Sequence, residues 1–463
     1  MLLRVGLPVA SLFALAVAAA GQCTPTYSGL LGLPGLGNGY ADPILAWDDG
    51  RGERLYVGGS FSEIGGAFAT ILARYEAATD TWSRVGSGLS TGSTNGFVTS
   101  MVVTSIGSPN GRDRLLVAGR FTSAGGVGGT EGIAAWDGTT WAPVYLTVPA
   151  GHAIWDMVVG DLGQGPRLFV AGGFGLPFGG IAQFDGESWS AVGTGVGIAG
   201  AFSPYVADLE IFNDGTGPAL YAVGRFDTVD GVATQLAARF VNGAWRRIGL
   251  GLSRLSDALK YLDAMTVHND GSGTALYVGG TQFGVTGSGT SNVAKWNGSA
   301  WSTVGQILGT GRVSALRGWH NGQSNDLYFA GTAFPGINNF GKLQGNQWVS
   351  VDGSLRDSAT PNSATSGNWP SAFGLGEWNG DLIIGGSFIT IGPVQARGIA
   401  ALQGCCPCAA DFNRDGGSDG ADVEAFFLAW EQGGTDGDVD CSGGTDGSDV
   451  EVFFRQWEAA GCF

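Results

Sequence analysis

The chain has 463 residues, a net charge of −17 and 84 glycines, yet 44% of its residues are hydrophobic, with 15 Trp and 25 Phe. So many aromatic residues beside so many glycines exclude a disordered or collagen-like chain and favour an all-β protein rich in turns. The acidic balance argues against nucleic acid as a partner, because phosphate binding needs clustered lysine and arginine.

The first 20 residues have the features of a secretory signal peptide. Arg4 precedes an apolar stretch that ends in an Ala-x-Ala site at residues 18–20, which predicts cleavage before Gly21 and a secreted, extracellular or cell-surface protein. No later apolar run is long enough for a membrane span. We therefore expect the six cysteines to form disulfides rather than to act as catalytic thiols.

A short apolar motif closed by a glycine occurs seven times. Its copies begin 51 to 60 residues apart, and repetition at such a period indicates an array of similar supersecondary units. We call this motif the signature. Its copies are Leu55–Phe61, Leu115–Phe121, Leu168–Phe174, Leu220–Phe226, Leu276–Phe283, Leu327–Phe334 and Leu382–Phe388.

Each unit holds four short segments with the pattern of β-strands. An apolar strand such as Val206–Ile211 comes first, a hairpin turn such as Asn213–Gly215 follows, and the signature is the second strand. A third strand such as Ala238–Phe240 then leads through a tight turn to a fourth strand that carries a tryptophan. Four antiparallel strands in each of seven units predict a seven-bladed β-propeller over residues 21–404. The fourth-strand tryptophans are Trp82, Trp141, Trp189, Trp245, Trp301 and Trp348.

The first unit carries a recognisable family pattern. Leu55-Tyr-Val-Gly-Gly is followed by Ala73-Arg-Tyr-Glu-Ala-Ala-Thr-Asp-Thr-Trp82, and this arrangement resembles a Kelch-type repeat. The resemblance implies the propeller fold and specifies no activity. Later units depart from it, because Ala118, Ala171 and Ala330 replace the first glycine of the signature.

The seventh unit ends at Gly404 without its tryptophan-bearing fourth strand. Residues 24–31 have the pattern of such a strand, with Tyr27 in the place of the tryptophan. We therefore expect this N-terminal strand to complete the last blade. The closure would bring Cys23 beside Cys405 or Cys406, and a disulfide there would stabilise the ring.

After a linker at 405–410, residues 411–463 contain two twelve-residue loops with the ligand spacing of EF-hand calcium loops. Oxygen-bearing side chains stand at positions 1, 3, 5, 9 and 12, glycine stands at position 6, and a backbone carbonyl serves position 7. Each loop runs into an amphipathic helix. The predicted ligands of two Ca²⁺ ions are Asp411, Asn413, Asp415, Gly417, Asp419 and Asp422, and then Asp438, Asp440, Ser442, Gly444, Asp446 and Asp449.

Duplicated calcium loops with Asp422 and Asp449 at position 12, each followed by one helix, resemble a dockerin module. The resemblance implies that the tail docks onto a cohesin-like or cell-surface protein. Two features depart from it: phenylalanine replaces the polar helix residues that a dockerin offers its partner, and Cys441 and Cys462 are added. A calcium-stabilised cap or surface anchor therefore stays open as the alternative.

Catalytic motifs are scarce in the ring. The sequence contains no nucleophile elbow, P-loop or His-Glu-x-x-His helix. Its histidines are His152, His268 and His320, and we expect the last two to lie in equivalent surface turns. Asp156, Asp208 and Asp263 recur in the first strand of three consecutive units, so we expect them to line the central channel, either as structural residues or as a cation site.

One face of the ring is predicted to carry aromatic residues. The connections from strand two to strand three and from strand four to the next unit share this face, and they favour carbohydrate or protein recognition, with ordinary loop packing as the alternative. Their aromatic residues are Tyr145, Trp155, Tyr205, Tyr261 and, within residues 352–371, Trp369.

These observations predict a secreted calcium-binding protein of two parts. The all-β seven-bladed propeller would be the binding platform, and the small α-helical, dockerin-like tail would be the docking element. The leading function is recognition or display without catalysis. The alternative is a secreted polysaccharide-degrading glycoside hydrolase, because dockerin-like tails often accompany such enzymes.

Overall fold

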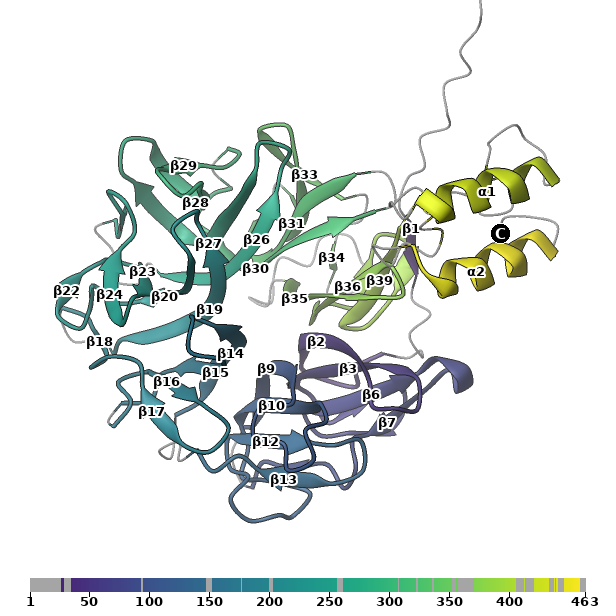
Figure 1. Cartoon of the computed structure of the whole chain (residues 1–463), viewed down its shortest axis with the longest axis horizontal. Coiled ribbons are helices and arrows are strands. Elements are labelled where there is room, and N and C mark those ends of the chain that lie inside the picture. Colours follow the sequence, from purple (N-terminus) through teal and green to yellow (C-terminus); the bar gives the residue numbers. More distant parts are fainter. Residues whose placement is uncertain are drawn as a thin grey trace, which may run out of the picture.

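The computed structural model describes residues 26–28, 35–92, 95–146, 152–175, 177–199, 203–255, 261–306, 308–321, 324–334, 337–351, 355–356, 370–404, 412, 420–432, 437, 439 and 445–458. Within these residues the strands form seven antiparallel sheets of four or five strands, arranged around a common axis (Figure 1). We number the sheets 1 to 7 by the position of their inner strand in the chain.

The inner strand of each sheet lies nearest the axis, and the signature strand pairs with it. Sheet 1 holds β2 (Tyr40–Asp48), β3 (Glu53–Ser60), β6 (Leu72–Glu76) and β7 (Thr81–Arg84). Sheet 2 holds β9 (Phe97–Thr104), β10 (Arg114–Arg120), β12 (Ile133–Trp136) and β13 (Trp141–Pro143). Sheet 3 holds β14 (Ile154–Asp161), β15 (Pro166–Gly172), β16 (Ile181–Phe184) and β17 (Trp189–Ala191).

The remaining sheets repeat this order of strands from the axis outwards. Sheet 4 holds β19 (Tyr205–Asn213), β20 (Pro218–Arg225), β23 (Ala237–Val241) and β24 (Ala244–Arg247). Sheet 5 holds β26 (Leu262–Asn269), β27 (Thr274–Val285), β28 (Gly289–Trp296) and β29 (Trp301–Thr303). Sheet 6 holds β30 (Arg312–His320), β31 (Asn325–Thr332), β32 (Phe340–Gln344) and β33 (Gln347–Ser350). Sheet 7 holds β35 (Ser371–Trp378), β36 (Asp381–Ser387), β39 (Ile399–Gln403) and β1 (Thr26–Ser28).

The seven inner strands contact one another in sequence, and β35 contacts β2, so their contacts form a circuit. Seven clusters of buried side chains fill the spaces between neighbouring sheets. Between sheets 4 and 5, for example, Tyr221 and Val223 of β20 lie in one cluster with Leu276 and Val278 of β27. Antiparallel sheets packed face to face around an axis are the architecture of a β-propeller.

The outer strand of sheet 7 comes from the other end of the chain. Strand β1 pairs antiparallel with β39, with Tyr27 opposite Leu402 and Ser28 opposite Ala401. The sheet therefore joins the N-terminal strand to the last strands of the ring, and Figure 1 shows β1 beside β39. The cysteines of the predicted disulfide lie outside the described residues.

The repeated glycine of the signature is explained by a close approach of the inner strand. A Cβ on Gly224 would lie 2.3 Å from the carbonyl oxygen of Tyr205, and the equivalent contact is 2.1–2.4 Å in the other six sheets. Opposite each of these glycines the inner strand has a β-bulge. The bulge bends the inner strand at this point. The seven glycines are Gly59, Gly119, Gly172, Gly224, Gly280, Gly331 and Gly386.

The fourth-strand tryptophans join neighbouring sheets by hydrogen bonds. Trp301 Nε1 donates to the carbonyl oxygen of Ile248 at 3.0 Å. Four other indoles make the same bond at 2.9–3.2 Å, always to the residue three positions after the fourth-strand tryptophan of the preceding sheet. In sheet 7 the hydroxyl of Tyr27 donates to Val351 O at 3.4 Å, so tyrosine takes the tryptophan's place. These four indoles belong to Trp141, Trp189, Trp245 and Trp348.

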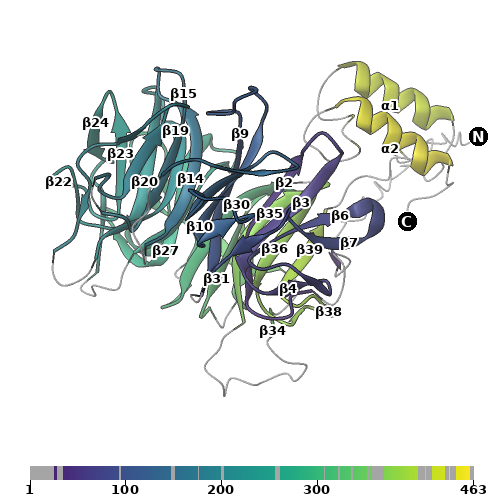
Figure 2. The same ribbon diagram turned by 90° about the horizontal axis from the view of Figure 1, so that it is seen from below.

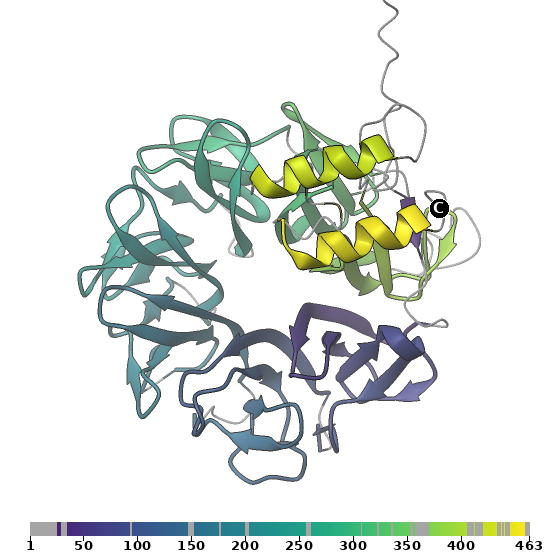
Figure 3. The same ribbon diagram turned by 45° about the vertical axis from the view of Figure 1, so that its right-hand side comes forward.

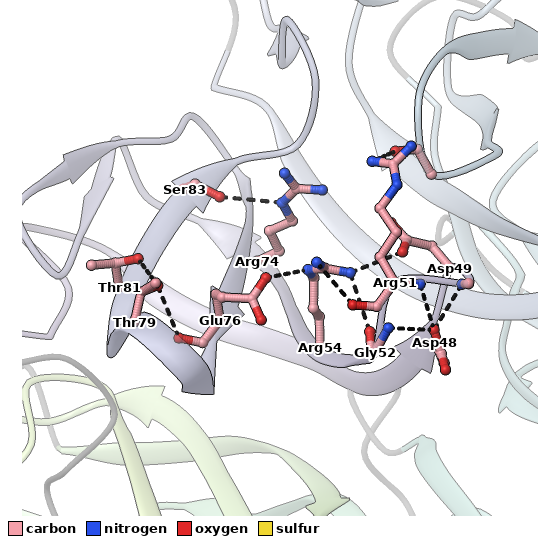
Figure 4. A network of polar contacts seen from close by, with 12 residues as sticks. Asp48, Asp49, Arg51, Gly52, Arg54, Arg74, Glu76, Thr79, Thr81 and Ser83 are labelled. Carbon is pink, nitrogen blue, oxygen red and sulfur yellow. Dashed lines mark hydrogen bonds and ion pairs between the residues drawn. The ribbon is translucent and has the colours of Figure 1, made fainter.

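The two faces of the ring differ in how their connections are built. The turn face carries the tight turns between strands one and two and between strands three and four. On sheet 1, Arg54 pairs there with Asp49 at 2.8 Å and with Glu76 at 2.6 Å (Figure 4). Beside this network, Asp48 Oδ1 accepts hydrogen bonds from three successive backbone N–H groups at 2.7–3.0 Å. The same kind of bond to turn N–H groups closes the inner strands at Asp161, Asn213 and Asn269.

The loop face carries the connections from strand two to three and from strand four to the next sheet. Short strands pair there across the gap between two sheets: β8 (Leu89–Ser90) with β11 (Ser123–Ala124), and β18 (Val196–Gly197) with β21 (Thr228–Val229). In the same way, β25 (Leu252–Ser253) pairs with β27, and β34 (Leu355–Arg356) pairs with β37 (Thr390–Ile391). Inter-sheet pairing therefore orders this face.

Two helices follow the ring, α1 (Gly420–Gln432) and α2 (Gly447–Glu458). Figures 2 and 3 show them side by side, and Figures 1 and 2 show them outside the ring. The rings of Phe426 and Phe453 stack between them with centroids 4.3 Å apart. Phe427 and Phe454 also contact each other across the pair, at 6.1 Å. The helices therefore have a small core of their own.

Candidate functional site

The inner strands begin at the loop face, and aromatic residues stand at or next to their first positions. Phe97 and Tyr205 are the first residues of β9 and β19, and Tyr261 directly precedes β26. The three are equivalent, since each carbonyl oxygen lies against the signature glycine of its own sheet. Trp155 is the bulge residue of β14. Four consecutive sheets therefore each place one aromatic side chain at the same end of the ring.

These four residues form a continuous line of ring contacts, which we call the aromatic arc. Phe97 and Trp155 stack with centroids 5.7 Å apart and 14° between their planes. Trp155 lies 6.5 Å from Tyr205, which lies 6.1 Å from Tyr261. Trp155 is 38% exposed, so the arc is open to solvent at its centre.

Three arginines lie over the rings of the arc. The guanidinium carbons of Arg120, Arg225 and Arg312 stand 4.8, 4.9 and 5.6 Å from the ring centroids of Phe97, Tyr205 and Tyr261, respectively. Guanidinium groups at this distance from an aromatic ring interact favourably with it. The arc therefore combines apolar surface with fixed positive charge.

Acidic side chains lie on the same inner strands, one or more residues further from the loop face. Asp263 pairs with Arg312 at 2.7 Å, and its side chain is 6% exposed. Asp156 accepts hydrogen bonds from the hydroxyl of Ser100 and the N–H of Leu209, both at 3.0 Å. The Ser100 hydroxyl and the Leu209 N–H come from the two neighbouring sheets, so this carboxyl group bridges three inner strands.

Asp208 has the same bridging role one sheet further on. Its carboxyl group accepts a hydrogen bond from the N–H of Met265 in β26. Burial raises the pKa of both Asp156 and Asp208, and the negative charge of Asp156 raises the pKa of Asp208 further. These two side chains therefore hold neighbouring sheets together, in agreement with the structural role that was one of the two alternatives from the sequence.

The predicted acidic triplet is extended by two residues that the sequence reasoning missed. Burial raises the pKa of Asp42 to about 7, with a contribution from Asp156, and raises the pKa of Glu210 to about 7 in the same way. Burial raises the pKa of Asp263 to about 6 against the opposing charge of Arg312. Several of these carboxyl groups therefore keep a proton close to neutral pH.

Spacing from the signature glycine could have found Asp42. It lies 17 residues before Gly59, as Asp263 lies 17 residues before Gly280. Asp156 and Asp208 each lie 16 residues before their glycines. Asp263 is therefore a bulge residue, one position away from the register that Asp156 and Asp208 share.

The expected turn position of His268 is wrong. His268 lies within β26, is 5% exposed, and packs on the ring of Tyr277 at 5.6 Å. Gly318 of the next inner strand leaves room for this imidazole, because a Cβ there would lie 2.4 Å from its Nδ1. His320 is exposed at the end of β30, and His152 is exposed with Nδ1 2.6 Å from Gly173 O. The histidines do not converge on one site.

The other predicted aromatic residues do not join the arc. Tyr145 is 77% exposed in the connection after β13, and Trp369 lies outside the described residues. Five further hydrophobic side chains are exposed on the ring, and each belongs to a connection or hairpin of the loop face. They are Phe68, Tyr145, Val232, Leu250 and Ile389.

Three of the twelve predicted calcium ligands lie within the described residues. Asp422 and Asp449 are fully buried at the first turns of α1 and α2. Asp449 accepts hydrogen bonds from the N–H groups of Val439 at 2.8 Å and Asp446 at 2.7 Å. Asp446 in turn accepts from the N–H of Ser448 at 2.8 Å, at the start of α2.

The other nine predicted ligands lie outside the described residues, namely Asp411, Asn413, Asp415, Gly417, Asp419, Asp438, Asp440, Ser442 and Gly444. Within the part of the chain that the structure describes, no three His, Cys, Asp or Glu side chains are grouped closely enough to hold a metal ion. Among these same residues, no helix is both long and apolar enough to span a membrane.

No protein-family model and no curated protein matches the sequence. Among solved structures, the chain is similar to the extracellular domain of a putative hybrid two-component system from B. thetaiotaomicron, with a TM-score of 0.48 and 10% identity over 80% of this chain. The match spans 39% of that longer chain.

Two smaller structures are also similar. The BBS1N chain crystallised with ARL6DN has a TM-score of 0.40 and 12% identity, over 82% of this chain and 96% of its own. The Dos1 propeller has a TM-score of 0.37 and 11% identity, over 78% and 95%. None of these three scores reaches 0.5, so the propeller architecture rests on the strand order and contacts of the chain itself.

Proposed function

We propose that this chain is a secreted, calcium-binding recognition protein. A seven-bladed, Kelch-like propeller is its binding platform, and a dockerin-like tail is its docking element. The observation that carries the proposal is the gathering of exposed hydrophobic side chains on one face: every large one on the described part of the ring belongs to the loop face. Single exposed hydrophobic side chains are common on protein surfaces, and it is their placement on one face that favours this face as the interaction surface.

The aromatic arc supports a saccharide or protein ligand at the centre of that face. Binding sites combine apolar and aromatic surface with a few polar groups that fix orientation, and the arc places arginines beside its rings. A glycan array probed with the full-length chain and with Trp155→Ala tests the proposal. Binding by the parent chain, lost in the variant and without turnover, is expected. Equal binding by both would contradict it.

Seven blades are supported by the seven sheets and by the circuit of inner-strand contacts. The Kelch-like pattern is strongest in sheet 1, where Tyr75 and Trp82 pack together with ring centroids 5.2 Å apart. The Tyr27 hydrogen bond to Val351 supports the view that a single chain closes its own ring. A closed ring leaves only short, protected strand edges.

A Ca²⁺ ion in each loop of the tail would account for the two buried aspartates. A carboxylate without exposed surface costs folding free energy unless its charge is compensated, and Asp422 and Asp449 are both fully buried. Ca²⁺ binds through carboxylate and carbonyl oxygens, which is the donor set of both loops. The ions would stabilise a tail whose own core is small.

Calorimetric titration of the full-length chain with Ca²⁺ tests the tail. We expect about two ions per chain, and Asp422→Asn and Asp449→Asn should each remove one binding event. Asp161→Asn is the matched control, because asparagine already stands at the equivalent ring positions Asn213 and Asn269. A chain that binds no Ca²⁺, or that binds equally after both tail substitutions, would exclude the calcium module.

A glycoside hydrolase is the second candidate, favoured by the raised pKa values of Asp42 and Glu210. A carboxyl group with a pKa of about 7 is suited to act as a general acid. Release of reducing sugar from a bound polysaccharide, abolished by Asp42→Asn or Glu210→Gln with binding retained, would establish this activity. Binding without sugar release supports the recognition function.

A further inference from the structure

We propose that the aromatic arc binds an acidic saccharide. Its sugar rings would pack on Trp155 and the neighbouring aromatic side chains, while the arginines of the arc would receive its carboxylate or sulfate groups. The inference rests on the recognition function proposed above and names the ligand class of that site.

The charge of the arc is unusual for this protein. The chain has 23 basic and 40 acidic residues, yet three arginines stand over three of the four rings of the arc. Guanidinium groups bind carboxylates and sulfate-like anions through paired N–H donors. A positive rim in an acidic chain favours a ligand with negative charge.

The arginines are fixed in orientation by the backbone. Nε and Nη2 of Arg225 donate to the same carbonyl oxygen, Ser203 O, at 3.2 and 2.8 Å. Arg120 is held in the same way by the carbonyl oxygen of Asn95, with its Nε at 3.0 Å. A guanidinium group has five N–H donors, and the anchor to Asn95 O uses two of those of Arg120. This anchor therefore orients the Arg120 guanidinium without using all of its donors.

The acidic side chains near the arc have partners within the protein or have raised pKa values. Asp263 is paired with Arg312 at 2.7 Å, so the charge of Arg312 is balanced within the protein. Asp156 and Asp208 accept hydrogen bonds from backbone N–H groups of the next inner strands. Burial raises the pKa of Asp42 and of Glu210 to about 7, which reduces their negative charge near neutral pH. A cationic ligand is disfavoured by the same geometry, since guanidinium groups already lie over three of the four rings.

Two matched pairs of polymers separate charge from sugar. Full-length protein is titrated by calorimetry with polygalacturonate and its fully methyl-esterified form, and with dextran sulfate and dextran. We expect the acidic member of at least one pair to bind at least ~10-fold more tightly, with affinity falling as salt rises. The two pairs distinguish a carboxylate from a sulfate as the favoured group.

Variants then place the binding on the arc. Arg120→Gln and Trp155→Ala should each weaken binding of the preferred acidic polymer by at least ~5-fold. Arg112→Gln makes the same charge change on an exposed turn-face residue. This control should bind as the parent does. Thermal melting of every variant checks that the ring is folded.

The outcomes separate this inference from the proposed function. Equal affinity for charged and neutral polymers, lost in Trp155→Ala, would overturn the acidic ligand class and leave the recognition site in place. Acidic binding that is unchanged in both arc variants would overturn the site. Absence of binding to all four polymers would overturn the inference, while the glycan array still decides the broader recognition function.

Discussion

The turn face and the loop face are the two ends of the same strands, yet their sequences follow different rules. On the turn face, Asp48, Asp161, Asn213 and Asn269 repeat one hydrogen-bonding scheme at the end of the inner strand. On the loop face, the residues that lie against the signature glycines vary in kind: three tyrosines, a phenylalanine, an alanine, an arginine and a serine. These are Tyr40, Phe97, Ala153, Tyr205, Tyr261, Arg312 and Ser371.

This difference separates the residues that build the ring from the residues that give it a surface. A repeated residue satisfies a requirement that recurs in every sheet, such as a backbone N–H group that needs an acceptor. The positions against the signature glycines have no such requirement, because the missing Cβ of the glycine already leaves room for the inner-strand backbone. The loop face is therefore free to carry a particular set of side chains.

The largest expected effect comes from filling the space that the signature glycine leaves. Gly224→Ala would bring a Cβ to 2.3 Å from Tyr205 O, and we expect a loss of about 3 kcal/mol in unfolding free energy, because backbone atoms must move. Urea unfolding measures it. Gly128→Ala is the control, since a Cβ there meets no atom within 4 Å. Similar losses in both variants would mean that close approach is not the reason for the repeat.

A second test compares the two faces through their carboxyl groups. The pKa of Asp42 is about 7 in the folded chain, well above its ordinary value of 3.8. The folded state therefore keeps this proton to a higher pH than the unfolded state does. As a result, Asp42 lowers the free energy of unfolding increasingly as pH rises from about 4 to about 7. Asp42→Asn should gain stability at pH 8 relative to pH 4, by about 2 kcal/mol after allowance for solvent screening.

Asp137 on the turn face should behave in the opposite way. Burial tends to raise its pKa, but hydrogen bonds from Thr139 and Thr140 outweigh it and lower the pKa to about 2. Its stabilising contribution is present above pH 4 and is lost as pH falls towards 2. Asp137→Asn should therefore lose stability at pH 8 and little at pH 2. Thermal melting of both variants at a series of pH values measures these changes. If both substitutions changed the stability at pH 8 in the same direction, the contrast between the faces would be contradicted.

The sequence predicted the repeating part of the molecule well, because the same residue types recur wherever each sheet has the same backbone geometry. The glycines, the fourth-strand tryptophans and the strand pairs all lie where the pattern put them. The channel residues were harder to predict. Asp42 differs from Asp263 in its neighbours, and Glu210 has no equivalent acid in the other sheets. A residue that occurs in only one of the repeated sheets cannot be found from the repeating sequence pattern.

His268 shows a second limit of the sequence pattern. It precedes the turn residues Asn269-Asp270-Gly271, which favoured a surface position. Its burial depends on Gly318 in the next sheet, 50 residues away in the sequence. Spatial neighbours of this kind are set by the packing of whole sheets. The aromatic arc is likewise assembled from four separate units.

The smallest expected effect concerns the bonds between sheets. Trp301→Phe removes the indole that donates to Ile248 O at 3.0 Å and leaves a buried carbonyl oxygen without that donor, so we expect a loss of about 1–2 kcal/mol. Tyr27→Phe removes the corresponding hydroxyl, whose distance to Val351 O is longer, at 3.4 Å. A bond of that length contributes less, so we expect a loss of no more than about 0.5 kcal/mol. Urea unfolding measures both variants. A larger loss in Tyr27→Phe than in Trp301→Phe would mean that the closing strand, rather than the repeated tryptophan, limits the stability of the ring.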